Sequence, residues 1–280
     1  MTAVAETNEP GSDPAAAGRS PQPRHLIITV YGLYARPDGG WLSVASLVRL
    51  LADLGIDETA VRSAISRLKR RGILAARRHG GSAGYQLSAG AEAILREGDA
   101  RIFRRRRATA ADGWVLAVFS VPESERHRRH VLRSELTRLG FGMVAPGVWI
   151  VPAHPADSTA ETLRRLELDG YADLFHADHL AFGDPAAKIR RWWDLDELER
   201  HYTAFIAAYK AVPARDGQAA FADYVRVLTD WRRLPYLDPG LPAELLPADW
   251  AGIRAADLFF ALQARLAEPA RAYVTRVLTG

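Results

Sequence analysis

The chain has 280 residues, a formal net charge of +4 and no cysteine. The lack of cysteine excludes disulfide bonds, thiolate metal sites and a cysteine nucleophile, and it fits a reducing cytoplasm. No apolar run reaches the ~18 residues that a membrane helix needs, and the amino terminus lacks the basic-then-apolar order of a signal peptide. We therefore expect a cytoplasmic protein of two or three domains with no membrane partner.

The positive charge is concentrated in one part of the sequence. Residues 24–107 contain 16 Lys and Arg against 7 Asp and Glu, whereas residues 1–23 and 108–280 are each net negative. A field of one sign that is confined to one domain favours a polyanionic partner there.

The first elements lead up to a tight turn. Residues 1–23 are rich in Pro, Ala and acids, which predicts a disordered arm. Residues 25–35 fit either a buried helix or a strand. Trp41 and Leu42 suit a short strand, and Ser43 can cap a helix that ends near Gly55.

A second helix follows after only two residues. Asp57 can cap it and Gly72 can end it, so the sequence predicts a helix from about 58 to 71. Behind it, residues 73–76 and 85–87 read as two short strands. They are joined by Arg77, Arg78, His79 and a tip rich in Gly and Ser.

The order of these elements is typical of a winged helix-turn-helix domain, in which the second helix of the pair enters the major groove. The alternative is an ordinary amphipathic surface helix followed by a hairpin, or a basic face that binds an acidic protein. Arg62 is the residue that we expect to contact guanine, with the wing in the minor groove or on phosphate. The predicted DNA-binding residues are Thr59, Arg62, Ser63, Ser66, Arg67, Lys69, Arg70, Arg77, Arg78 and His79.

Residues 88–103 predict a capped helix that ends in four arginines, Arg104 to Arg107. The arginines suit either phosphate binding or a solvated linker. Residues 112–182 then predict the order βαββαβ of a ferredoxin-like domain. Its elements are expected at 114–121 (strand), 125–139 (helix), 141–145 and 148–151 (strands), 159–168 (helix) and 174–182 (strand).

The last region is predicted to be helical. Asp194 and Glu197 resemble a capping box, and four prolines within residues 234–250 suggest an ordered, packed connection. A final helix is expected over 253–278, with Pro269 bending or restarting it. The expected fold class is α+β, with domains at 24–107 (winged helix-turn-helix and linker helix), 108–185 (ferredoxin-like) and 186–280 (all-helical).

Three stretches together resemble the PaaX-type repressors of phenylacetate catabolism, and the resemblance covers nearly the whole chain after residue 23. They are RHLIITVYGLYARPDGGWLSVASLVRLLADLGIDETAVRSAISRLKRRG; WVLAVFSVPE with LGFGMVAPGVWIVP; and RRWWDL with LPYLDPGLPAELLPADW. The resemblance implies a homodimeric repressor that binds double-stranded operator DNA. It also implies a middle domain similar to the small CRISPR-adaptation endoribonucleases, and release from DNA by an aryl-acyl-CoA such as phenylacetyl-CoA.

A coenzyme A thioester needs cations for its phosphates and apolar walls for its acyl group. The candidate effector-binding residues are Arg190, Arg191, Trp192, Trp193, Arg232 and Arg233; the alternative is a packed junction between domains. No bound cofactor is expected.

Enzyme function is the rival class, because the middle domain resembles a metal-dependent nuclease. Ser120 stands where those nucleases carry an acidic metal ligand, and a hydroxyl does not replace a carboxylate for a hard cation. His176 and Asp178 would face one side of a strand and His179 the other, which favours surface residues over a metal site. We expect no catalytic or metal-binding residue.

Overall fold

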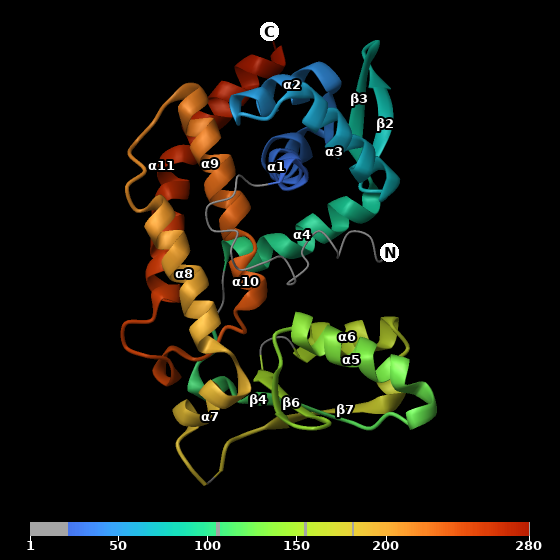
Figure 1. The fold of residues 1–280 in the computed structure, drawn as a ribbon, viewed down its shortest axis with the longest axis vertical. Coiled ribbons are helices and arrows are strands. Elements are labelled where there is room, and N and C mark those ends of the chain that lie inside the picture. Colours follow the sequence, from blue (N-terminus) through green and yellow to red (C-terminus); the bar gives the residue numbers. More distant parts are fainter. Residues whose placement is uncertain (1–21, 105–106, 154–155, 181, 280) are drawn as a thin grey trace. The chain divides into compact units, whose positions relative to one another are not determined.

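A computed structural model of the chain describes residues 22–104, 107–153, 156–180 and 182–279 (Figure 1). The predicted α+β class is confirmed, since the fold combines helices with two small antiparallel sheets. Most of the expected arm, residues 1–21, lies outside the described residues. Within these ranges, no helix combines the length and the apolar character that a membrane span requires.

The chain divides into two compact units. The first unit comprises residues 1–103, 203–233 and 253–280, and the second comprises residues 104–202 and 234–252. The three domains expected from the sequence follow one another along the chain, whereas each of these units combines separate stretches of it. The division into three domains therefore stays a prediction.

The ambiguous stretch at the start of the first unit is helical. α1 (Pro23–Val30) has proline at its amino end, where the missing N–H costs nothing, and it continues into a turn of π-helix (Tyr31–Ala35). A short strand, β1 (Trp41–Ser43), and α2 (Val44–Asp53) follow, as predicted. The side chain of Ser43 caps α2 by accepting a hydrogen bond from the Ser46 amide.

The hairpin of the first unit is longer than predicted. Its strands are β2 (Leu74–His79) and β3 (Ser82–Leu87), in a sheet of order β1-β3-β2. Gly80 and Gly81 both have positive φ and form a two-residue turn, whose twist matches the flanking strands. Strand pairing therefore continues to His79 opposite Ser82, so the expectation of a loop at residues 77–79 is wrong.

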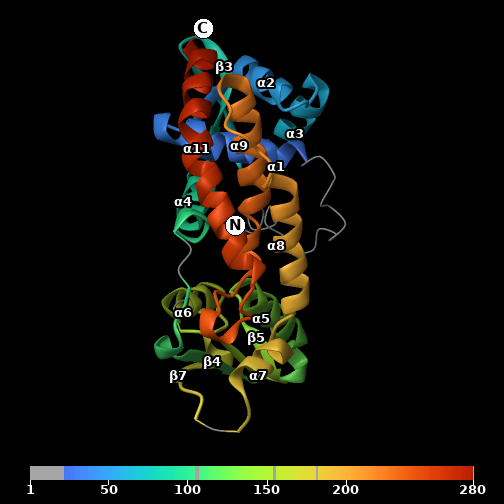
Figure 2. The same cartoon turned by 90° about the vertical axis from the view of Figure 1, so that its left-hand side faces the viewer.

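The carboxyl-terminal helices of the first unit pack against its amino-terminal elements. This unit contains α4 (Ala89–Phe103), α9 (Gly217–Trp231) and the parts of α8 (Leu195–Tyr209) and α11 (Ala251–Thr279) that begin at residues 203 and 253. Figures 1 and 2 show α9 and α11 side by side, and Trp231 stacks on Phe259 with ring centroids 4.6 Å apart. Thr29 of α1 and Thr229 of α9 share a buried hydrogen bond of 2.8 Å.

Asp53, at the end of α2, connects this helix to two carboxyl-terminal helices. Its carboxylate accepts hydrogen bonds from Gln218 Nε2 at 2.9 Å and from the Tyr273 hydroxyl at 2.6 Å. In addition, Arg226 donates to the Leu54 carbonyl. The position of α2 is therefore fixed by residues that lie more than 160 positions away in the sequence.

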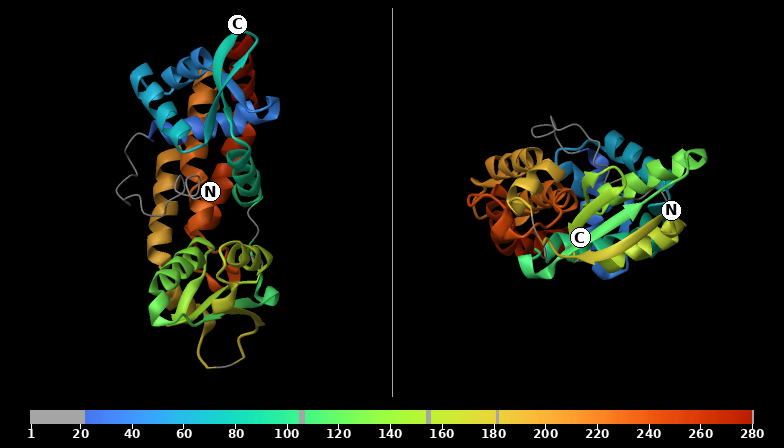
Figure 3. Two further views of the ribbon diagram at one scale, coloured as in Figure 1. Left: turned by 90° about the vertical axis from the view of Figure 1, so that its right-hand side faces the viewer. Right: turned by 90° about the horizontal axis from the view of Figure 1, so that it is seen from below.

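The second unit contains the other sheet. Its elements are β4 (Trp114–Phe119), α5 (Arg126–Arg138), β5 (Gly142–Ala145), β6 (Val148–Pro152), α6 (Ala156–Arg165) and β7 (Ala172–Ala177). The strands are antiparallel in the order β5-β6-β4-β7, and Figures 1 and 3 show α5 and α6 over one face. Leu132, Leu136 and Leu163 pack from these helices against Val115 and Val151 of the sheet.

The last strand differs from its expected span of residues 174–182. β7 pairs with β4 from Ala172 opposite Phe119 to Ala177 opposite Trp114. The described residues 178–180 pair with no strand, because the partner strand β4 begins at Trp114. A further helix, α7 (Pro185–Trp192), was not predicted.

The proline-rich connection is ordered, as predicted, and Asp238 organises it. Asp238 is buried and accepts hydrogen bonds from the Tyr202 hydroxyl, Arg107 Nη2 and the Gly240 amide. A short helix, α10 (Leu234–Leu237), precedes it, and α11 then runs through Pro269 as one helix.

Candidate nucleic-acid interface

α3 (Glu58–Arg70) is the predicted recognition helix, and its bounds agree with the prediction to within one residue. The Asp57 side chain accepts a hydrogen bond from the Ala60 amide and so satisfies one of the free donors of the first turn. One face of α3 is buried in the core of the first unit. Val61, Ala64, Ile65 and Leu68 make up this face, each at most 2% exposed.

The opposite face of α3 is polar, basic and open to solvent. The seven predicted DNA-binding residues of this helix, Thr59, Arg62, Ser63, Ser66, Arg67, Lys69 and Arg70, are all exposed. Arg62, Ser66 and Lys69 lie within about 60° of one another around the helix axis. This stripe is narrow enough to enter a groove while the buried face holds the helix in place.

Arg62 is already paired in this structure. Its Nη2 and Nε lie 2.6 and 2.7 Å from Glu58 Oε1, and the side chains of Arg62 and Glu58 are 60% and 57% exposed. The pair was not predicted, although the spacing of four residues in a helix could have indicated it. Glu58 orients the Arg62 guanidinium along the helix. A contact between Arg62 and a DNA base would have to replace this ion pair.

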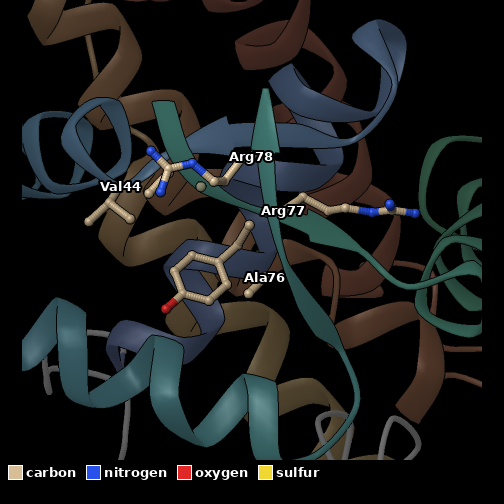
Figure 4. A pocket seen from close by; sticks show the side chains of 7 residues that line it. Val44, Ala76, Arg77 and Arg78 are labelled. Atoms are coloured by element: carbon tan, nitrogen blue, oxygen red, sulfur yellow. The ribbon is translucent and has the colours of Figure 1, made fainter. Parts of the chain in front are cut away.

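The side chains of the hairpin divide between the two faces of the sheet. Arg77, Arg78 and His79 are exposed, and Figure 4 shows Arg77 and Arg78 pointing in opposite directions from β2. Arg78 Nη2 donates to the Gly81 carbonyl at 2.8 Å, so this arginine is folded back onto the tip. An open depression of about 200 Å³ lies beside these residues and includes Val44 and Tyr85.

Trp41 supports the hairpin, and its role was not predicted. Its indole Nε1 donates to the Arg77 carbonyl at 3.2 Å, and its ring lies 5.4 Å from that of His79. A Cβ atom at Gly84 would lie 2.6 Å from the Trp41 ring and 2.3 Å from the Leu42 carbonyl oxygen. The close approach of β1 to β3 therefore requires glycine at this position.

Four of the predicted effector-binding residues line one open pocket. Arg190, Arg191, Trp192 and Trp193, at the end of α7 and just beyond it, border a pocket of about 380 Å³ that residues 194–196 complete. Trp193 also packs on the sheet: its Nε1 donates to the Gly140 carbonyl, and its ring lies 6.3 Å from that of Trp114. Structural packing explains Trp193, whereas Arg190 and Arg191 are exposed.

Arg232 and Arg233 belong to the first unit, so they form a separate set. They follow α9 and lie beside His25 at the start of α1. Burial, together with the charges of Arg232, Arg24 and Arg233, lowers the pKa of His25 to about 3. The imidazole is therefore neutral at neutral pH, and its Nε2 accepts a hydrogen bond from Arg24 Nε.

The remaining polar candidates have local partners. Arg107 is paired with Asp238, while Arg105 and Arg106 lie outside the described residues. His176 Nε2 lies 3.2 Å from the Asp112 carbonyl oxygen, and His179 Nε2 lies 3.1 Å from Lys188 Nζ. Over the ranges that the structure describes, no group of three His, Cys, Asp or Glu side chains is arranged to hold a metal ion.

Three family models match consecutive parts of the chain. A model described as "PaaX-like protein" matches residues 22–91, "PaaX protein central Cas2-like domain" matches residues 107–189, and "PaaX-like protein C-terminal domain" matches residues 193–276.

Two known proteins are similar over most of the chain. The Escherichia coli (strain K12) protein named "Transcriptional repressor PaaX" is 31% identical over 267 residues, which cover 89% of this chain and 82% of that protein. The solved structure of "Uncharacterized protein Rv0674 from Mycobacterium tuberculosis" is similar with a TM-score of 0.59 and 26% identity, over 87% of this chain and 96% of that one.

Proposed function

Because the chain belongs to the PaaX family of transcriptional regulators, we propose that it represses transcription by binding operator DNA through a winged helix-turn-helix formed by residues 24–107. The observation that carries this proposal is the exposed basic face of α3. The opposite face of the helix is apolar and buried, and its packing in the core holds the helix in place. The exposed basic face lies within residues 24–107, which contain 16 Lys and Arg against 7 Asp and Glu.

In this proposal α3 enters the major groove. Arg62 leaves Glu58 and contacts guanine through two hydrogen bonds, as arginine commonly does. Ser63 and Ser66 face bases or phosphates, while the remaining basic residues of α3 hold the backbone and set the register.

The hairpin is the proposed wing. Within the described part of the chain, the Arg77 side chain makes no hydrogen bond or ion pair, whereas Arg78 is held by Gly81. We therefore assign the main phosphate or minor-groove contact of the wing to Arg77, with His79 beside it near the tip.

The rest of the chain is assigned to assembly and control. We propose that residues 108–185 form a ferredoxin-like domain, and that the protein is a homodimer with two half-sites about one helical turn, or a multiple of it, apart. An aryl-acyl-CoA is the proposed effector, with Arg190, Arg191 and Trp192 as its candidate site. A change in α9 or α11 would reach α2 through Asp53, and a coupling of ~1–3 kcal/mol is typical of such linkage.

Two other functions are weaker. A metal-dependent nuclease would need a carboxylate near the end of β4, but Ser120 stands there, so we propose that the protein is not an enzyme. An activating or architectural role uses the same DNA surface, and the position of the operator relative to the promoter distinguishes it from repression.

Selection of bound sequences from randomised duplex DNA tests the proposal. The expected result is enrichment of two related half-sites at fixed spacing, with affinity that falls steeply as salt rises. Adding phenylacetyl-CoA, with free coenzyme A as the control, then tests release. No enrichment of any sequence would overturn the repressor proposal. Enrichment without release of the DNA by phenylacetyl-CoA would overturn only the proposal for the effector.

A further inference from the structure

The outer face of α5 in the second unit carries an unusual concentration of positive charge. The helix has the sequence RHRRHVLRSELTR, with five arginines and two histidines against one glutamate. Its inner face is occupied, because Leu132 and Leu136 are fully buried against the sheet. The charge is therefore confined to the sides and the outer face.

Three of the five arginines are used within the domain. Arg128 pairs with Glu125 and lies over the Tyr171 ring, Arg129 pairs with Glu123, and Arg138 pairs with Glu135. These contacts neutralise the charges locally and fix the side chains. They explain part of the helix composition without any partner.

The other two arginines are not explained in this way. Arg126 and Arg133 are exposed, and their side chains make no hydrogen bond or ion pair with the described residues. At about 100° per residue, Arg126, His130 and Arg133 lie within about 60° of one another, with Arg126 and Arg133 about 10 Å apart along the axis. We call these three residues the α5 stripe; it contains no apolar and no acidic side chain.

We propose that the α5 stripe binds the phosphate backbone of DNA, as a second contact surface separate from α3 and the hairpin. Each strand of duplex DNA carries a phosphate about every 3.4 Å of axis, so a stripe of about 10 Å spans several of them. The absence of apolar side chains from the stripe disfavours a hydrophobic partner. The guanidinium groups of Arg126 and Arg133, which pair with no described residue, suit phosphate oxygens. This inference rests on the proposed DNA-binding function. The α5 stripe adds affinity for DNA without preference for its sequence.

The salt dependence of DNA binding tests the stripe. Fluorescence anisotropy would follow binding of the full chain to a labelled duplex of arbitrary sequence between about 50 and about 200 mM salt. Each phosphate contact contributes about 0.9 to the slope of log affinity against log salt, so Arg126→Ala with Arg133→Ala should reduce its magnitude by about 1.8. The charge-conserving variant, Arg126→Lys with Arg133→Lys, should retain most of the slope.

The matched control is Arg200→Ala with Arg254→Ala, which removes two exposed arginines elsewhere and should leave the slope unchanged. Thermal melting should be the same for all variants, since every substituted residue is exposed. If the wild type binds DNA and the α5 variant keeps its slope, the stripe proposal is wrong while the repressor proposal stands. If the α5 variant loses binding to polyglutamate but not to DNA, the stripe belongs to an acidic protein partner and the proposal is likewise overturned. If the wild type binds no DNA, both proposals fail.

Discussion

Replacing Arg62 with alanine separates the stability of α3 from its recognition of DNA. In the free protein the side chain contributes an exposed ion pair with Glu58, four residues away, and exposed pairs of this kind stabilise a helix by about 0.3–0.5 kcal/mol. The loss of one bidentate guanine contact instead costs about 1–3 kcal/mol of binding free energy, or roughly 5- to 150-fold in affinity. The effect on DNA binding should therefore exceed the effect on folding several times over.

A matched control exists in the same unit. Arg96 of α4 forms the same type of pair with Glu92, at 2.8 Å and with the same spacing. Arg96→Ala removes the same charge and the same kind of contact, so its cost in stability should match that of Arg62→Ala. It should leave base preference unchanged, because Arg96 lies outside the proposed recognition surface.

The assay combines urea unfolding with selection of bound sequences from randomised DNA. For Arg62→Ala we expect a nearly unchanged unfolding midpoint and the loss of preference at one base pair in each half-site. Equal losses of affinity for Arg62→Ala and Arg96→Ala would refute the reasoning, because they would show a general effect of charge. An unchanged sequence preference in Arg62→Ala would refute the assignment of this residue.

Three further substitutions test the supports of the site. Gly84→Ala places a methyl group against the Trp41 ring and should cost about 1–3 kcal/mol of unfolding free energy in urea, together with DNA affinity; a wild-type midpoint would show that β1 can move aside. Asp53→Ala leaves the Tyr273 hydroxyl without its acceptor and should lower the unfolding free energy by about 1 kcal/mol and weaken DNA binding, whereas wild-type values would argue against coupling through this residue. The pKa of His25 is about 3 in the folded chain and 6.5 ordinarily, so between these pH values the unfolded chain binds a proton that the folded chain does not. The contribution of His25 to the unfolding free energy should therefore be full above about pH 6.5 and fall as the pH drops towards 3. His25→Gln should flatten this pH dependence in urea unfolding, and an unchanged dependence would mean that other groups cause it.

Local signals predicted most elements correctly because their causes are local. The bounds of α3 follow from the Asp57 cap and from Gly72, which has a φ of 69° just beyond the helix. The helix expected to end near Gly55 and the helix expected over residues 125–139 are likewise present, as α2 and α5. The sequence prediction made the hairpin strands too short. Gly80 and Gly81 close the turn by themselves because both adopt positive φ, so residues 77–79 remain in the strand.

Long-range pairing could not be read from the sequence. The end of β7 is set by the start of its partner strand, and the role of Trp41 depends on the approach of β1 to Gly84. In the same way, the packing of α9 against α1 joins residues 200 positions apart through Thr29 and Thr229. Within the candidate interface, the exposed residues of α3 followed from periodicity, whereas the direction of each wing arginine required the structure.

Site-specific photo-crosslinking tests the central claim, that α3 lies in a groove of bound DNA, most directly. A photoreactive amino acid at Ser66 would probe α3, and the same group at Thr203 of α8 would serve as an exposed control. With the selected operator bound, we predict that the probe at Ser66 crosslinks to bases within a half-site and that the probe at Thr203 does not. Saturated DNA binding with no crosslink from Ser66, or with equal crosslinking from both positions, would contradict the assignment of α3 as the recognition helix.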